Sequence, residues 1–109
     1  EWQMPRISVV VPVYNADKYI GETLQSIGNQ TFGDFDVHVV DDCSTDGSAA
    51  IVQAFCAGDD RFSYHRSPSN FGGPAGPRNL GIEKSSGEYV AFCDADDLWH
   101  AEKLRVMQA

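Results

Sequence analysis

A short apolar stretch at Ile7–Pro12, with the sequence ISVVVP, decides how this chain folds. A continuous run of mostly β-branched residues of this length predicts a strand that is buried on both faces of a sheet. After a short turn, apolar residues recur at Ile20, Leu24 and Ile27. Their i, i+4, i+7 spacing predicts an amphipathic helix over about residues 16–30. The chain therefore opens with a buried strand and a helix that packs on its sheet.

The same alternation of strand and helix continues along the chain. Further strands are predicted at Phe35–Val40, Arg61–Arg66 and Glu88–Cys93. One intervening helix is predicted in the stretch that carries Ile51, Val52 and Phe55, and another at Arg78–Ser85. Repeated strand–helix–strand units predict an α/β fold with a parallel sheet of about four strands and helices on both faces. Residues 1–109 are expected to form one domain or part of one.

Composition and charge exclude several classes of protein. The chain is 42% hydrophobic and 22% charged, which is typical of a globular protein and not of a collagen-like or disordered one. The net charge of −8 repels phosphate backbones, so we expect no nucleic-acid partner. No apolar run approaches the length that crosses a bilayer. The three cysteines contain no C-x-x-C pair, so we expect neither disulfides nor a zinc site, and a reducing, cytoplasmic environment.

Acidic residues follow two of the predicted strands, at the point where each strand ends. They are Asp41, Asp42, Asp94, Asp96 and Asp97. The carboxyl ends of parallel strands meet at one edge of the sheet, where α/β proteins bind ligands, and clustered carboxylates repel one another unless a cation offsets their charge. If extended geometry persists, Asp94 and Asp96 face the same side, which predicts a Mg²⁺ or Mn²⁺ site completed by a phosphorylated substrate. A second interpretation stays open, in which these residues only cap the segment that follows.

Four other motifs fit the sequence less well. Asp42–Gly47 begins like an EF-hand loop, but a strand precedes it and its twelfth position is Gln53. The glycine-rich stretch at Gly72–Gly76 matches neither the dinucleotide fingerprint nor the P-loop. Cys43 has no matching histidine for a Cys–His nucleophile. A strand that ends in Asp-x-Asp also begins the haloacid-dehalogenase phosphatases, but only 11 residues follow Leu98, too few for the later motifs of that family.

Four ordered motifs together carry a family resemblance. They are ISVVVPVYN at residues 7–15, VDDCSTDGS at 40–48, NFGGPAGPRNLG at 70–81 and FCDADD at 92–97. In this combination the chain resembles the amino-terminal half of a family 2 glycosyltransferase with the Rossmann-like GT-A fold. The resemblance implies a site for a nucleotide-diphosphate sugar, most often a UDP-sugar, with Mg²⁺ or Mn²⁺ bridging the diphosphate. One departure is Pro77, where family members commonly carry Ala, although proline is accepted in the first turn of a helix.

The resemblance also implies a role for each matching residue. Nucleotide-sugar binding would fall to Pro12, Val13, Tyr14, Asp41, Asp42, Arg78 and Asp94, and metal binding to Asp94 and Asp96. A guanidinium and a divalent ion both offset the charge that builds on a leaving diphosphate. The site would therefore combine donor binding with stabilisation of the leaving group.

The resemblance also implies an inverting reaction, in which the configuration at the anomeric carbon changes. The general base of such an enzyme is a carboxylate that lies downstream of the Asp-x-Asp motif. Glu102 is the only carboxylate after Asp97, and its sequence context is typical of a solvated helix face, so the base is expected beyond Ala109. The expected function is transfer of a sugar to an acceptor hydroxyl on a carbohydrate or lipid-linked acceptor, with this chain supplying the donor side and inactive alone. The alternative is a non-catalytic nucleotide-binding or interaction module. An exposed sheet edge also predicts self-association, and the parent protein would be cytoplasmic or peripheral to the inner face of the cell membrane.

Overall fold

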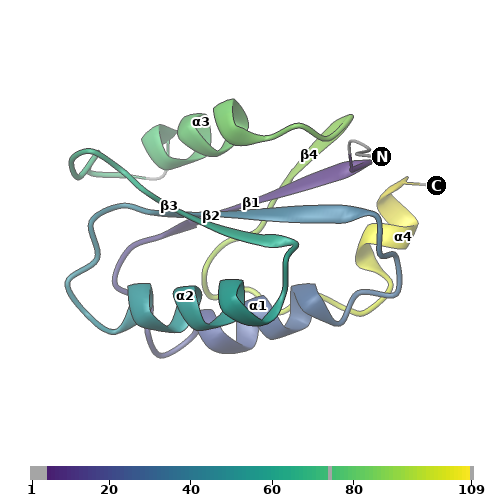
Figure 1. The fold of residues 1–109 in the computed structure, drawn as a ribbon, viewed down its shortest axis with the longest axis horizontal. Coiled ribbons are helices and arrows are strands. Elements are labelled where there is room, and N and C mark those ends of the chain that lie inside the picture. The colour runs from purple at the N-terminus through teal and green to yellow at the C-terminus, as the bar shows by residue number, and fades with distance from the viewer. Residues whose placement is uncertain (1–4, 74, 109) are drawn as a thin grey trace.

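A parallel four-stranded sheet forms the centre of the protein (Figure 1). The computed structural model describes residues 5–73 and 75–108. The strands are β1 (Ile7–Val13), β2 (Phe35–Asp41), β3 (Phe62–Arg66) and β4 (Tyr89–Phe92). They lie in the order β3-β2-β1-β4, and each neighbouring pair is parallel. The predicted α/β class and four-stranded parallel sheet are confirmed.

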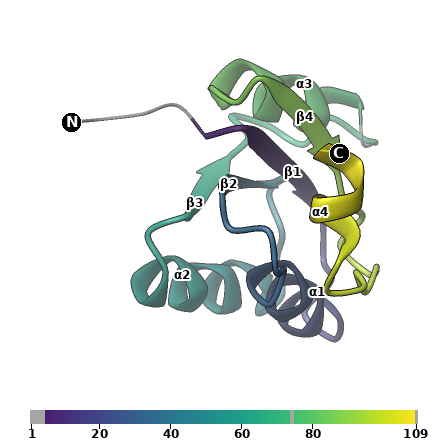
Figure 2. The same cartoon turned by 90° about the vertical axis from the view of Figure 1, so that its right-hand side faces the viewer.

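Helices cover both faces of this sheet. They are α1 (Ile20–Gly28), α2 (Ser48–Gly58), α3 (Ala75–Lys84) and α4 (Lys103–Gln108). Figures 1 and 2 show α1 and α2 side by side under one face and α3 over the other. Within the described residues, no helix combines the length and the apolar character of a membrane span.

The main core lies between the sheet and the helices α1 and α2. Val9 and Val11 of β1 are fully buried, because this strand has a neighbour on each side and helices on each face. Ile20, Leu24 and Ile27 are also fully buried, so the predicted apolar stripe is the face by which α1 packs on the sheet. Burying a side chain of this size contributes roughly 1.5–3 kcal/mol, which makes this layer the main source of stability.

Two helices begin at positions that differ from the prediction. α1 begins at Ile20 and not near residue 16, because contacts with the loop after β2 hold the residues before it. Asn15 has a positive φ of 48°. The Ala16 N–H donates to the Ser48 hydroxyl at the start of α2, and the Asp17 N–H donates to the Asp46 carboxylate in the loop before that helix. α3 begins at Ala75, three residues before the predicted start at Arg78, and this places Pro77 in the first turn of the helix.

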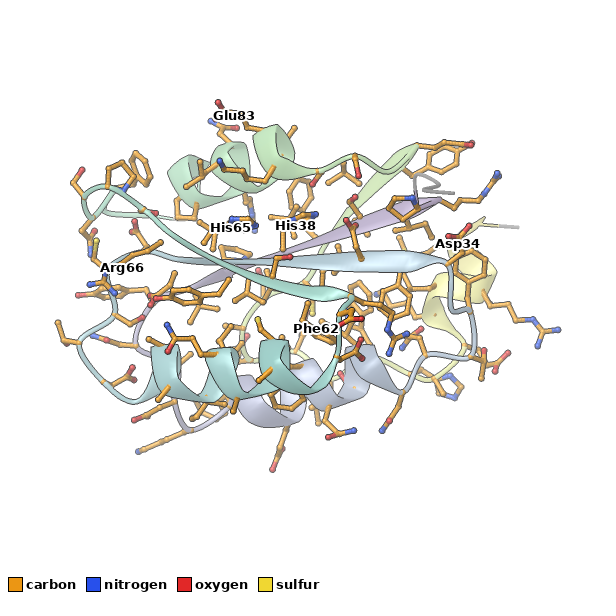
Figure 3. All side chains as sticks on the ribbon, in the orientation of Figure 1. Asp34, His38, Phe62, His65, Arg66 and Glu83 are labelled. Atoms are coloured by element: carbon orange, nitrogen blue, oxygen red, sulfur yellow. The ribbon has the colours of Figure 1, made fainter. Side chains whose placement is uncertain are left out.

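The layer under α3 is more polar than the layer under α1 and α2. Figure 3 shows His38 and His65 between the sheet and α3, whereas Phe62 lies on the opposite side, toward α2. The His38 Nδ1 and His65 Nε2 atoms are 3.0 Å apart, and the His38 Nε2 lies 2.9 Å from a carboxylate oxygen of Asp36. A chain of polar contacts therefore crosses two strands of the sheet beneath this helix.

Candidate functional site

A cavity of about 360 Å³ opens at the carboxyl ends of the strands. This volume is within the range of small-molecule sites, and the position is the one where open parallel sheets bind ligands. The residues that line the cavity come from the ends of β1, β2 and β4, from the loop before α3 and from the first turn of α3. They are Pro12, Val13, Tyr14, Asp42, Asn70, Gly72, Gly73, Pro77 and Asp94.

Asp42 is the most firmly held acid of this cavity. The residue is only 4% exposed, and both of its carboxylate oxygens accept the Phe71 N–H, at 3.0 and 3.1 Å. Its own N–H donates to the Val13 carbonyl at 2.8 Å, which ties the end of β2 to the end of β1. A carboxylate has about four acceptor positions, so Asp42 keeps capacity for a donor group of a ligand.

The loop before α3 closes one side of the cavity. Asn70 accepts the Gly72 N–H at 2.6 Å and donates its own amide to the Asp42 carbonyl at 3.3 Å. Gly72 has a φ of +78°, a backbone conformation that suits glycine because a Cβ would be strained there. The Phe71 ring packs against Gly76, where a Cβ would collide with it. Glycine at these positions thus lets the loop fold back over Asp42 and over the start of α3.

Asp41 lies beneath the cavity and not in it, which corrects the expectation that it contacts the nucleotide. Its side chain is almost completely buried, and its carboxylate accepts the Tyr64 hydroxyl at 2.6 Å and the Ser44 N–H at 2.9 Å. The Arg66 guanidinium lies 3.5 Å from the same carboxylate. Burial and the bond to Asp41 raise the pKa of Tyr64, which keeps the phenol protonated as a donor. With these partners, Asp41 fixes the turn that presents Asp42.

Asp94 and Arg78 form an ion pair at the mouth of the cavity. The Arg78 Nη2 and Asp94 Oδ1 atoms are 3.4 Å apart, and the two side chains are 40% and 60% exposed. The guanidinium also lies over the Phe92 ring, 5.7 Å from its centroid. An ion pair this exposed is worth at most about 1 kcal/mol, so Arg78 can exchange Asp94 for another anion.

The carboxylates after β4 do not gather as the strand spacing predicted. β4 ends at Phe92, and the Asp97 N–H donates to the Asp94 carbonyl at 3.1 Å, so the Asp-x-Asp motif lies in a turn and not in an extended strand. Of the five acidic residues expected at this edge, only Asp42 and Asp94 line the cavity, while Asp96 is exposed outside the lining. In residues 5–73 and 75–108, no three His, Cys, Asp or Glu side chains are placed to hold a metal together.

The capping interpretation of these acids is not supported either. The next helix, α4, begins only at Lys103, so no helix directly follows Asp97 for them to cap. Cys93, directly before the motif, is buried, and burial together with the nearby Asp97 and Asp94 raises the pKa of its thiol to about 12. This thiol stays neutral near pH 7 and supplies neither a nucleophile nor a metal ligand.

Sequence reasoning therefore found most of this cavity. Five residues named from the sequence lie in the lining, and their binding roles stay predictions: Pro12, Val13, Tyr14, Asp42 and Asp94. Arg78, also named from the sequence, pairs with Asp94 at the mouth of the cavity. The site residues named from the sequence did not include four other lining residues, although all four lie in the motif NFGGPAGPRNLG at residues 70–81: Asn70, Gly72, Gly73 and Pro77. The feature that could have identified Asn70 is its place in the loop that leads from β3 back to the mouth of the cavity.

Comparison with known proteins gives the family. The match to the family described as "Glycosyl transferase family 2" covers residues 8–109. The chain belongs to glycosyl transferase family 2. The resemblance seen in the four sequence motifs is confirmed.

Bacterial glycosyltransferases are among the similar proteins. The poly(ribitol-phosphate) beta-N-acetylglucosaminyltransferase TarS of Staphylococcus aureus is 41% identical over 104 residues, which cover 94% of this chain and 18% of TarS. The putative teichuronic acid biosynthesis glycosyltransferase TuaG of Bacillus subtilis is 41% identical over 100 residues, which cover 92% of this chain and 39% of TuaG. The chain thus spans less than half the length of these relatives.

Solved structures of glycosyltransferases are similar to this chain over most of its length. S. aureus TarS 1–349 in complex with UDP-GlcNAc gives a TM-score of 0.89 at 40% identity, over 94% of this chain and 30% of that one. The mannosyltransferase PcManGT of Pyrobaculum calidifontis, in complex with GDP-Man and Mn²⁺, gives 0.84 at 31% identity, over 94% of this chain and 31% of that one. The predicted GT-A nucleotide-binding half is confirmed by this agreement.

Proposed function

We propose that this chain is the donor-binding part of an inverting glycosyltransferase that uses a nucleotide-diphosphate sugar, in the first place a UDP-sugar. The observation that carries the proposal is the cavity in which Asp42 and Asp94, from two different strand ends, face one ligand-sized space. The preference for uridine is supported by TarS, whose structures hold UDP and UDP-GlcNAc and which is more similar to this chain than the GDP-Man-bound PcManGT.

The nucleoside would occupy the inner part of the cavity. Pro12 and Val13 offer their backbone and apolar surface there, and the exposed Tyr14 offers an aromatic face at the rim. The Asp42 carboxylate accepts an N–H from the edge of the base, in addition to the Phe71 N–H that it already accepts. A charged acceptor held this firmly favours a base that presents a ring N–H, as uracil and guanine do.

The diphosphate would occupy the mouth of the cavity. Arg78 offers a guanidinium to it, since its present partner Asp94 is an exposed carboxylate that is easily exchanged. Asp94 and Asp96 are the residues that would hold Mg²⁺ or Mn²⁺. Their oxygen donors fit such an ion, which usually takes one or two carboxylates and completes its shell with water and substrate phosphate. When bound, the ion would offset negative charge on the leaving diphosphate.

The acceptor and its general base are expected in a further part of the protein. This is supported by the share of the relatives that the chain covers, 18% of TarS and 39% of TuaG. An acceptor hydroxyl would attack the anomeric carbon after losing its proton to that base, and the diphosphate would leave toward Arg78. Residues 1–109 alone are therefore expected to bind donor but to transfer little or no sugar.

Calorimetric titration of UDP and GDP, each with Mn²⁺ and with EDTA, tests the proposal. We expect UDP to bind more tightly than GDP and more tightly with Mn²⁺ than with EDTA. Asp42→Asn should weaken UDP binding about 10- to 100-fold in both conditions, because a hydrogen bond to a charged group is worth roughly 1.5–3 kcal/mol. Asp96→Ala should remove only the additional affinity that Mn²⁺ confers.

Asp60→Asn is the matched control, since it removes an exposed carboxylate between α2 and β3, outside the cavity lining. It should leave all four titrations unchanged. UDP binding that ignores Mn²⁺ in the unmodified protein would favour the non-catalytic nucleotide-binding module instead. No binding of either nucleotide would contradict the donor site itself.

A further inference from the structure

The helix α1 carries a polar row beside its apolar stripe. Thr23, Ser26 and Gln30 follow one another at i, i+3 and i+7, the spacing of one helix face that continues just past the helix end. Thr23 is fully buried and Gln30 is 7% exposed. Buried hydroxyl and amide groups need partners, so this row must satisfy polar groups of a neighbouring segment.

That neighbour is the segment of residues 93–102, which contains neither helix nor strand. Three of its backbone groups are bound by the polar row. The Thr23 hydroxyl donates to the Ala95 carbonyl at 2.8 Å, and the Trp99 N–H donates to the Ser26 hydroxyl at 3.0 Å. The Gln30 side-chain amide donates to the His100 carbonyl at 2.7 Å. α1 therefore fixes the path of the chain after β4.

The first of these contacts falls in the middle of the Asp-x-Asp motif. Ala95 separates Asp94 from Asp96, and the turn around it is closed by the Asp97 N–H on the Asp94 carbonyl. Because β4 has already ended, no strand pairing orients this peptide. The Thr23 hydroxyl, from α1, binds this peptide at the Ala95 carbonyl, between the two carboxylates.

We propose that Thr23 is a positioning residue for the diphosphate and metal side of the site, a role that rests on the proposed function. By holding the Ala95 carbonyl, it keeps the turn in the shape from which Asp94 and Asp96 would bind one ion. Mg²⁺-type ions demand near-ideal octahedral geometry, so a small rotation of this turn weakens the metal contact strongly. The nucleoside side rests on the ends of β1 and β2, and Asp42 is held there by Phe71 and Val13. The two sides of the site should therefore respond differently to a change at Thr23.

Thr23→Val tests this, because it removes the hydroxyl and keeps the shape of the side chain. UDP is titrated into the intact protein with Mn²⁺ and with EDTA. We expect the affinity in Mn²⁺ to fall by roughly five- to tenfold, the range of one net hydrogen bond, and the affinity in EDTA to stay unchanged. Thr23→Ser, which keeps the hydroxyl, should restore the Mn²⁺ effect. Thr23→Ala gives the same comparison if the valine variant does not fold.

Ser26→Ala is the matched control, because it removes a hydroxyl from the same row but leaves the Ala95 contact in place. Ser26→Ala should lower the unfolding temperature about as much as Thr23→Val does. It should keep the gain in UDP affinity that Mn²⁺ gives over EDTA. The proposal is overturned if Thr23→Val keeps the unmodified Mn²⁺ effect, or if it loses affinity equally in Mn²⁺ and EDTA. Failure of the unmodified protein to bind UDP at all would instead contradict the proposed function, and this inference with it.

Discussion

Two adjacent acidic residues, Asp41 and Asp42, lie in different surroundings at the end of β2. Asp41 and Asp42 are neighbours in the sequence, yet the first is bound by Tyr64 beneath the cavity and the second lines it. β2 ends at Asp41, and the Asp42 N–H continues the pairing with β1 on the Val13 carbonyl, so that extended backbone turns the two adjacent side chains to opposite sides. Cys43, with a φ of 63°, completes the turn that follows them. The two acids therefore have different roles although their chemistry is the same.

His65 is a second residue whose surroundings change its chemistry. Its ring stacks on His38 with the ring centroids 5.2 Å apart. Burial, and then the nearby His38 and Lys84, lower the pKa of His65 below its ordinary value of 6.5. The unfolded chain therefore takes up a proton at His65 more readily than the folded protein.

This difference predicts a loss of stability on acidification. The contribution of His65 is complete above pH 6.5 and is lost as the pH falls from there through its lowered folded pKa. His65→Gln should therefore flatten the decline in unfolding free energy between about pH 7.5 and 5.5, by less than roughly 1 kcal/mol since the group is only partly buried. Urea unfolding of both proteins at pH values of about 7.5 and 5.5 measures this change in unfolding free energy. The exposed His100→Gln serves as the control, and an equal decline in both variants would contradict the prediction.

Whole elements are placed by close packing as much as by their sequence patterns. α3 crosses β1 so closely that a Cβ at Gly81 would collide with the Val10 side chain. The helix has a weak apolar stripe, and its buried residues are Pro77 and Gly81, so its position depends on this close approach. A glycine in a helix interior usually costs about 1 kcal/mol relative to alanine, and here the packing outweighs that cost.

Gly81→Ala should accordingly destabilise the protein. Overpacking against Val10 typically costs about 1–3 kcal/mol, which exceeds the gain in helix propensity. Gly58→Ala is the matched control at the end of α2, where a Cβ meets no atom within 4 Å. Equilibrium urea unfolding should show a loss for Gly81→Ala and no loss for Gly58→Ala. A gain of stability in both variants would show that α3 moves away from β1 without penalty.

At the scale of the whole molecule, the β4 edge of the sheet carries exposed apolar side chains. β4 is the last strand in the order β3-β2-β1-β4, and Tyr89, Val90 and Phe92 on it are exposed by 55%, 37% and 44%. Edge strands with unpaired backbone groups and exposed apolar side chains pair readily with another chain. Within the described residues, no further strand pairs with β4 on this side.

We therefore predict self-association through β4. The mean mass measured by sedimentation should rise with protein concentration. Val90→Lys should keep the protein monomeric over the same range, because a charge on an edge strand blocks pairing. Ala57→Lys, an exposed position on α2 on the other side of the molecule, should leave the association unchanged. A single monomeric species at every concentration would contradict the prediction.

The order of strands and helices followed from the sequence, because apolar runs and stripes have periods that belong to one kind of element. The cavity was also largely predictable, since parallel strands bring their carboxyl ends to one edge. Helix starts were less predictable: α1 begins late because Ser48 and Asp46, about 30 residues away, hold the N–H groups before it. Such contacts between distant residues leave no periodic signal in the sequence.

Local pattern by itself determined the fold class, the family and most of the cavity lining. Tertiary structure alone decided that Asp41 is a support, that the Asp-x-Asp motif forms a turn, and that Thr23 holds this turn. The physical reason is the range of the interactions. Periodicity records which face of an element is buried, whereas the partner of a buried polar group is set by segments that meet only after folding.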